Sequence, residues 1–194
     1  MYGSQIENSN IILKLYQDPR TVFKIADIAL ITGQNNPESL AKKLNYYVKT
    51  GKIHSPRRGL YVKPGYNPEE MASKLFTPSY ISLQSVLQRA GVIFQYSEKL
   101  TLISYLSREV EVDGQIFTYR RARQKVLYNW NGIIRNDQGI YQATPERAFV
   151  DLCYLEPGFY FDNLSPLNRN LVENLLAIYS SPNLNKRVKN ILSS

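Results

Sequence analysis

Residues 36–62 read NPESLAKKLNYYVKTGKIHSPRRGLYV, and this stretch decides the fold that the sequence predicts. It opens with Asn36, Pro37 and Glu38, which supply an N-cap, a proline suited to the first helical position and an acid in the first turn. Apolar residues then recur at helical spacing until a glycine, the usual residue just beyond a helix. These residues are Leu40, Leu44, Tyr47 and Val48, with Gly51 after them. We therefore expect a helix over residues 37–50.

A β-hairpin is expected after this helix. Ile53 opens a short strand, residues 55–59 form a turn that contains Pro and Gly, and Leu60–Val62 returns as the partner strand. Upstream, residues 6–17 and 23–30 each carry apolar side chains at helical spacing. The order helix, helix, helix, hairpin is that of a winged helix-turn-helix, whose third helix enters the major groove of DNA.

Basic residues concentrate in the first third of the chain. Residues 1–66 carry ten Lys and Arg against four Asp and Glu, whereas residues 67–194 carry fourteen against twelve. The Pro- and Gly-rich segment at residues 63–68 separates the two regions, because such a segment continues neither a helix nor a central strand. We therefore expect two domains, at 1–66 and 67–194. The overall net charge of +8 favours a polyanionic partner.

The predicted third helix and hairpin carry the candidate DNA contacts. When the apolar stripe faces the core, the opposite face of the helix holds a hydroxyl, an aromatic ring and several cations. The candidate DNA-binding residues are Asn36, Ser39, Lys42, Lys43, Tyr46, Lys49, Lys52, Arg57 and Arg58. A lysine-bearing helix face is also typical of an ordinary solvated surface, and winged helices also bind proteins. The coincidence of a basic helix face with a basic hairpin favours DNA.

The second region predicts a mixed α/β domain with an antiparallel sheet and flanking helices, so the expected fold class is α+β. Asp113-Gly114 is a two-residue hairpin turn, because both positions tolerate a positive φ. Thr144 caps a strong helix that begins at Pro145. Further helices are expected near residues 79–90, 169–179 and 183–192, and short strands at 92–94, 100–106, 110–112, 116–119, 127–128, 133–134 and 140–141.

Several classes of protein are excluded by composition. One Cys and one His rule out a disulfide scaffold and the usual Cys/His zinc sites. No apolar run approaches the roughly 20 residues needed to span a bilayer. The first ten residues, MYGSQIENSN, lack the pattern of a signal peptide. We expect a cytoplasmic protein with no cofactor, metal or catalytic residue, in which Cys153 is a buried, unreactive thiol.

Two charged segments of the second region have open interpretations. Glu109, Glu111 and Asp113 alternate along a strand, as do the Mg²⁺ ligands of some nucleases. No carboxylate-lysine pair, nucleotidyltransferase motif or phosphate loop accompanies them, which favours a solvated hairpin face. A basic run follows, and its cations are Arg120, Arg121, Arg123 and Lys125. These cations form either a second nucleic-acid contact or counter-charges for the acidic strand.

A set of short blocks runs through both regions in a fixed order. They are Phe23–Ala29, Ser39–Leu40, Arg58–Val62, Pro78–Leu87 and Ala143–Leu152. This ordered set resembles the AbiEi-type antitoxins of type IV toxin–antitoxin systems. The resemblance implies a transcriptional autorepressor of a two-gene abortive-infection operon, acting on double-stranded operator DNA. It also implies an antidote to a nucleotidyltransferase-like toxin, acting without a stable complex.

The leading prediction is therefore a DNA-binding repressor with an antitoxin role. One alternative is a Mg²⁺-dependent nuclease or RNA-modifying enzyme that a winged helix targets, and another is an adaptor in which both domains bind protein. The sequence leaves open the operator, the oligomeric state and the way in which the toxin is neutralised. A monomer that binds repeated sites cooperatively is one expectation for the oligomeric state.

Overall fold

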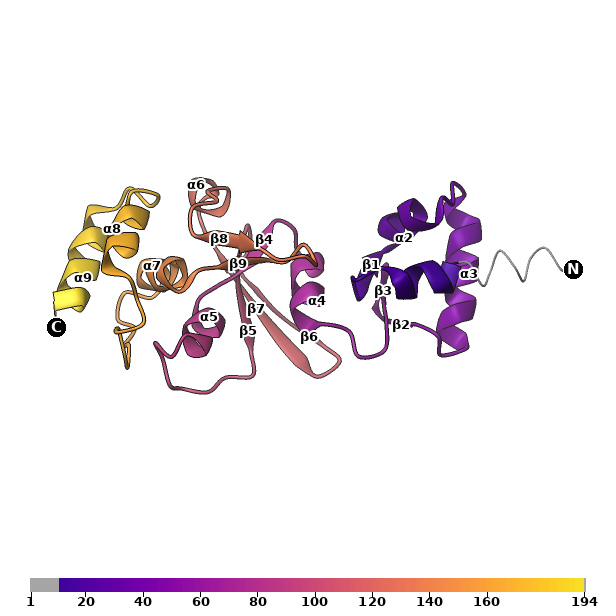
Figure 1. The fold of residues 1–194 in the computed structure, drawn as a ribbon, viewed down its shortest axis with the longest axis horizontal. Helices are drawn as coiled ribbons and strands as arrows, with labels where there is room; N and C mark the ends of the chain where they lie inside the picture. The colour runs from indigo at the N-terminus through magenta and orange to yellow at the C-terminus, as the bar shows by residue number, and fades with distance from the viewer. Residues whose placement is uncertain (1–10, 194) are drawn as a thin grey trace, which may run out of the picture. The chain divides into compact units, whose positions relative to one another are not determined.

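The structure is a computed structural model that describes residues 11–193, and it divides the chain into two compact units, Met1–Lys74 and Leu75–Ser194 (Figure 1). Both units contain helices and strands, so the protein is α+β. The sequence placed the boundary at residue 66, within the Pro/Gly-rich segment. The division falls further along the chain because α4 (Pro68–Leu75), which the sequence did not predict, is held to the first unit by Glu70.

The first unit contains a helical stretch at residues 11–17 and a three-stranded antiparallel sheet in the order β1-β3-β2. Its other elements are β1 (Val22–Lys24), α2 (Ile25–Thr32), α3 (Pro37–Lys49), β2 (His54–Arg57), β3 (Leu60–Val62) and α4. The predicted helix at 6–17 is helical over its described part, and its first residues lie outside the described range. α3 and the second hairpin strand agree with the prediction to within one residue, whereas the first hairpin strand runs three residues further than predicted.

The predicted helix at 23–30 begins too early. Phe23 belongs to strand β1 and pairs with Tyr61 of β3, which buries both rings. α2 starts two residues later, where the backbone N–H of Lys24 donates to Asp27 Oδ2 at 2.8 Å. Strand pairing with a segment almost forty residues away therefore overrides the helical spacing of this apolar run.

One apolar core holds the first unit together. α3 contributes Leu40, Leu44 and Tyr47 to it, whereas Val48 is only half-buried. The other buried members are Ile11, Leu15, Phe23, Ile28, Ile53 and Tyr61. Because α3 buries this stripe, its opposite face is exposed to solvent.

Acidic and basic side chains link the ends of elements in the first unit. Glu70 Oε2 of α4 accepts from the backbone N–H and the hydroxyl of Thr21, both at 2.7 Å. Arg20 Nη2 lies 2.7 Å from Asp18 Oδ2. The hydrogen bond from Arg20 holds the pKa of the Asp18 carboxyl below its ordinary value.

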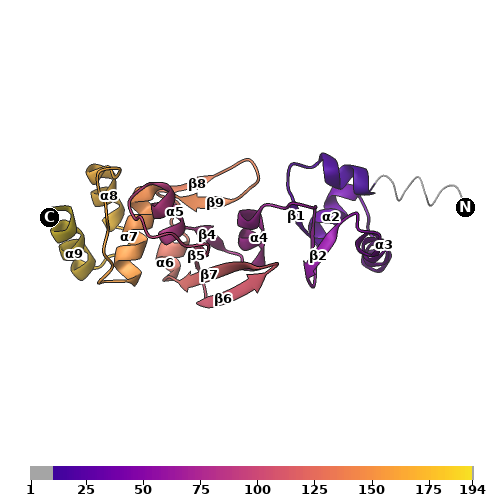
Figure 2. The same cartoon turned by 90° about the horizontal axis from the view of Figure 1, so that it is seen from below.

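The second unit is built on a six-stranded sheet in the order β6-β7-β5-β4-β9-β8. Its strands are β4 (Ser79–Ile81), β5 (Leu100–Ser104), β6 (Arg108–Val112), β7 (Gln115–Arg121), β8 (Ile133–Arg135) and β9 (Tyr141–Ala143). Its helices are α5 (Gln84–Arg89), α6 (Gln124–Leu127), α7 (Pro145–Leu155), α8 (Arg169–Leu176) and α9 (Pro182–Ser193). In both views α7 lies between the sheet and the pair α8 and α9 (Figures 1 and 2).

This sheet is mixed, whereas the sequence predicted an antiparallel one. β5 pairs in parallel with β7, and β4 pairs in parallel with β9. The hairpin turn that joins β6 to β7 is predicted correctly, with positive φ at Asp113 and Gly114. β6 is the edge strand, and β7 lies between β6 and β5. β7 is antiparallel to β6 and parallel to β5.

Three short apolar runs were assigned to the wrong element. Residues 79–81 form β4 rather than the start of a helix, residues 92–94 form no strand, and Leu127 ends helix α6. Runs of this length fit either period, so periodicity alone does not assign them. α7 begins as predicted, because the hydroxyl of Thr144 accepts from the backbone N–H of Arg147.

Candidate functional site

The exposed face of α3 carries four of the nine predicted DNA contacts. Lys42, Tyr46 and Lys49 are exposed, and Tyr46 retains 56% of its accessible surface. No described carboxylate pairs with Lys42 or Lys49. Ser39 is half-buried on the same face. The arrangement offers cations for phosphates and a phenol for a base edge.

The hairpin tip is shorter than predicted. β2 extends through Arg57, so only Arg58 and Gly59 form the turn. Ser55 Oγ donates to the carbonyl of Leu60 at 2.9 Å and braces the hairpin. Both arginines are exposed, and Arg58 has no ion-pair partner among the described residues. The tip can therefore place long cations against a phosphate backbone.

Three of the predicted contact residues also have structural roles. Asn36 Oδ1 accepts from the backbone N–H groups of Glu38 and Ser39, so its carbonyl serves as the N-cap of α3. The Lys52 ammonium lies 5.7 Å from the centroid of the Tyr47 ring. Lys43 is half-buried and interacts with other residues of the protein.

Glu109 and Glu111 of the acidic strand are not counter-charges for the basic run. In the β6–β7 register Glu109 faces Thr118 and Glu111 faces Ile116, and neither carboxylate forms an ion pair with a described cation of the basic run. Glu109 is instead bound by Lys99, whose Nζ lies 3.0 Å from Oε2. The sequence left open whether the basic run supplies counter-charges for the acidic strand, and these pairings show that it does not do so for Glu109 and Glu111.

The four cations of the basic run have different surroundings. Arg120 is half-buried and forms an ion pair with Glu156. Arg121, Arg123 and Lys125 are exposed and form no ion pair with any described residue. Only these last three have charges available to a partner.

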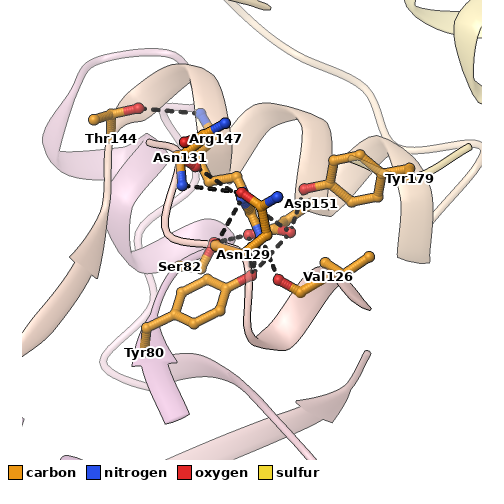
Figure 3. A network of polar contacts seen from close by, with 9 residues as sticks. All are labelled: Tyr80, Ser82, Val126, Asn129, Asn131, Thr144, Arg147, Asp151 and Tyr179. Carbon is orange, nitrogen blue, oxygen red and sulfur yellow. Dashed lines mark hydrogen bonds and ion pairs between the residues drawn. The ribbon is translucent and has the colours of Figure 1, made fainter. Parts of the chain in front are cut away.

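A buried polar network lies at the centre of the second unit (Figure 3). Arg147 and Asp151 of α7 are 0% and 1% exposed in their side chains, and Arg147 Nε lies 3.4 Å from Asp151 Oδ1. Asp151 accepts from the hydroxyls of Tyr179, Ser82 and Tyr80, at 2.5, 2.8 and 3.1 Å. Burial raises the pKa of the Asp151 carboxyl, although Arg147 and the three hydroxyls favour its charged form.

The guanidinium of Arg147 is fully satisfied. Its Nη1 donates to the carbonyls of Asn131 and Asn129, at 2.8 and 3.3 Å. Its Nη2 donates to the carbonyl of Val126 at 2.8 Å and to Tyr80 Oη at 3.1 Å. With Nε on Asp151, all five N–H donors have acceptors. The network thus fastens the loop after α6 to α7 and β4, and it leaves no donor for a ligand.

The sequence blocks contain four residues of this network, but the contacts between them were not predicted. Tyr80 and Ser82 belong to the block Pro78–Leu87, and Arg147 and Asp151 belong to Ala143–Leu152. The available signal was an Arg and an Asp four residues apart among the apolar residues of one helix. Such a pair lies on a single helix face and must be satisfied when that face is buried.

Residues 11–193 contain no group of three or more His, Cys, Asp or Glu side chains placed to hold a metal ion. No helix within that range is both long and apolar enough to cross a membrane.

The fold has a solved counterpart. The crystal structure of the RV2827C protein from Mycobacterium tuberculosis aligns with a TM-score of 0.58 and 13% sequence identity. The alignment covers 97% of this chain and 76% of that one, so nearly the whole chain shares its fold. No protein-family model matches the sequence, and no curated protein does.

Proposed function

We propose that this protein is a DNA-binding transcriptional autorepressor whose first unit is a winged helix-turn-helix. In this proposal α3 is the recognition helix and the β2–β3 hairpin is the wing. The observation that carries it is the face of α3, where exposed Lys42, Tyr46 and Lys49 lie opposite the buried stripe of Leu40 and Leu44. The side chains of a recognition helix reach base edges in the major groove, where lysine can bind guanine, and neighbouring cations neutralise phosphates.

We further propose that the repressor is the antitoxin of a type IV, abortive-infection operon. This part rests on the ordered blocks that resemble AbiEi-type antitoxins. The blocks Pro78–Leu87 and Ala143–Leu152 meet in the buried network, so in this proposal they maintain the fold of the second unit. The partner is a nucleotidyltransferase-like toxin that is neutralised without a stable complex.

A mobility-shift experiment tests the repressor. The full chain should bind duplex DNA from upstream of its own gene more tightly than a scrambled duplex of equal length. Lys42→Ala/Lys49→Ala should abolish this preference. Lys186→Ala/Lys189→Ala, which removes the same charge from α9, should not. Equal affinity for both duplexes would exclude a sequence-specific repressor.

Co-expression tests the antitoxin role. If the neighbouring gene encodes a nucleotidyltransferase-like protein, its expression should arrest growth, and this chain should restore growth when supplied from a separate promoter. A stable complex of the two proteins in gel filtration would contradict a type IV system.

A further inference from the structure

The basic run leads to a second binding feature that the proposed repressor surface does not include. Arg121 and Arg123 line an open pocket of about 590 Å³ in the second unit. Tyr105, Tyr128 and Tyr154 line the same pocket. Pockets that bind small molecules are commonly about 300–1,000 Å³, so a group the size of one nucleotide fits this volume.

The charge of the pocket favours an anionic occupant. Both guanidinium groups are exposed, and no described carboxylate pairs with either of them. Among the described residues that line the pocket, none is acidic. Arg120 lines a different pocket, because neighbouring residues of a strand point to opposite faces of the sheet.

The tyrosines favour an occupant with flat rings. Tyr105 and Tyr128 keep 47% and 56% of their surfaces exposed, so both rings are accessible for stacking. Tyr154 is held in place because its ring packs against buried Tyr179, with 5.2 Å between centroids. Aromatic rings beside arginines are the combination that binds bases by stacking and phosphates by charge.

We propose that this pocket binds single-stranded nucleic acid, with an unpaired base stacked on Tyr105 or Tyr128 and its phosphates bound by Arg121 and Arg123. A base within a duplex is covered by neighbours on both faces and cannot enter a pocket, whereas an unpaired base can. This activity is separate from duplex binding by the first unit. An acidic peptide would satisfy the arginines but would make little use of three tyrosines.

Fluorescence anisotropy with the full chain tests the charges. The probes are fluorescein-labelled dT12 and U12, which separate DNA from RNA, and an operator duplex. Arg121→Ala/Arg123→Ala should weaken single-strand binding at least about tenfold and lower the log–log salt slope by about 1.4, or about 0.7 per lost phosphate contact. It should leave duplex affinity within about twofold. Lys42→Ala/Lys49→Ala should weaken duplex binding and leave single-strand affinity within about twofold. The two proposals can therefore fail independently.

Variants that keep the charge test the stacking. Tyr105→Leu and Tyr128→Leu together should weaken single-strand binding by about 5- to 150-fold, the range expected when one base loses its stack. Tyr160→Leu is the matched control, because Tyr160 is 77% exposed and lies outside the pocket lining. Far-ultraviolet circular dichroism should be unchanged in all variants.

Three outcomes would overturn the proposal. The first is wild-type single-strand affinity in the double arginine variant. The second is displacement of dT12 by poly-glutamate as efficiently as by unlabelled dT12, which would show a site that reads charge alone. The third is equal loss of affinity in the Tyr160→Leu control. Ultraviolet crosslinking of a 4-thiouridine oligonucleotide should label the pocket segments if the proposal holds.

Discussion

The hydroxyl of Tyr179 donates to Asp151 Oδ1 at 2.5 Å, and this contact joins the segment after α8 to the middle of α7. Both residues are buried. Burial and the neighbouring Asp151 carboxylate raise the pKa of Tyr179 well above its ordinary value, so its hydroxyl remains a donor. Together with Tyr80, Ser82 and Arg147, the pair connects α7 to β4, to the loop after α6 and to the segment after α8.

Removing the buried arginine should cost much of the second unit's stability. Arg147→Met removes the side-chain donor from the carbonyls of Asn129, Asn131 and Val126 and leaves Asp151 without its counter-charge, so we expect a loss of about 3–5 kcal/mol. Urea unfolding followed by the fluorescence of Trp130, the single tryptophan, measures it. Arg169→Met, at an exposed position of α8, should change stability by less than about 0.5 kcal/mol. A loss below about 1 kcal/mol in Arg147→Met would refute the structural role of the network.

Gly132→Ala should be more harmful than an ordinary glycine substitution. Gly132 has φ of +75°, and an added Cβ would lie 2.8 Å from Arg147 Cβ and 3.2 Å from Leu175 Cδ2. Gly114→Ala is the matched control, since φ is +80° but no atom lies within 4 Å of the added Cβ. The control should lose about 1–2 kcal/mol from backbone strain alone, and Gly132→Ala should lose more. Equal losses in urea unfolding would show that the loop can shift away from α7.

The Asp18–Arg20 pair should stabilise the first unit only above acidic pH. The pKa of Asp18 is lowered in the folded state, so the folded form binds fewer protons than the unfolded form near pH 4. The stabilisation is present above the ordinary pKa of 3.8 and is lost as the pH falls below it. Wild type should therefore be more stable than Asp18→Asn at pH 7, by at most about 1 kcal/mol, and this difference should shrink as the pH falls below 3.8. A constant difference from pH 7 to pH 3 in circular dichroism melts would contradict this pairing.

Substitutions in the proposed recognition helix and in the proposed wing should change DNA binding in different ways. Arg57→Ala/Arg58→Ala should weaken operator and random DNA by similar factors and flatten the salt dependence by about one log–log unit per lost phosphate contact. Ser39→Ala, Lys42→Ala or Tyr46→Ala should instead narrow the gap between operator and random DNA, by roughly 1–3 kcal/mol for a residue that reads a base.

Titrations at several salt concentrations separate these two outcomes. Loss of discrimination in the arginine variant, with its salt slope intact, would reverse the roles of the two elements. The wing would then read the minor groove, where arginine favours narrow A·T-rich stretches.

The acidic edge strand should not bind a catalytic metal. Glu109 is bound by Lys99 and by the hydroxyl of Thr118, and Glu111 is exposed on β6. Mg²⁺, Mn²⁺ or Zn²⁺ should therefore leave the melting temperature of EDTA-treated protein unchanged. Stabilisation by several degrees at low metal excess, abolished by Glu109→Ala or Glu111→Ala, would revive the nuclease alternative.

Local sequence determined the elements whose caps, turn residues and apolar spacing lie within a few residues of one another. The Asn36 cap and the apolar stripe fixed α3, Thr144 fixed the start of α7, and Asp113-Gly114 fixed the β6–β7 turn. Capping and turn energies depend on neighbours up to about four residues away, so a single sequence reveals them. The exposed face of α3 followed from the same spacing.

Only the tertiary structure decided which distant segments meet. It placed Phe23 in a strand, made the larger sheet mixed, and put Arg121 and Arg123 on a pocket with three tyrosines. It also brought Tyr80 to Asp151, 71 residues along the chain. These arrangements depend on burying apolar surface and satisfying buried polar groups across the whole unit, and periodicity along one segment carries no record of the partner segment.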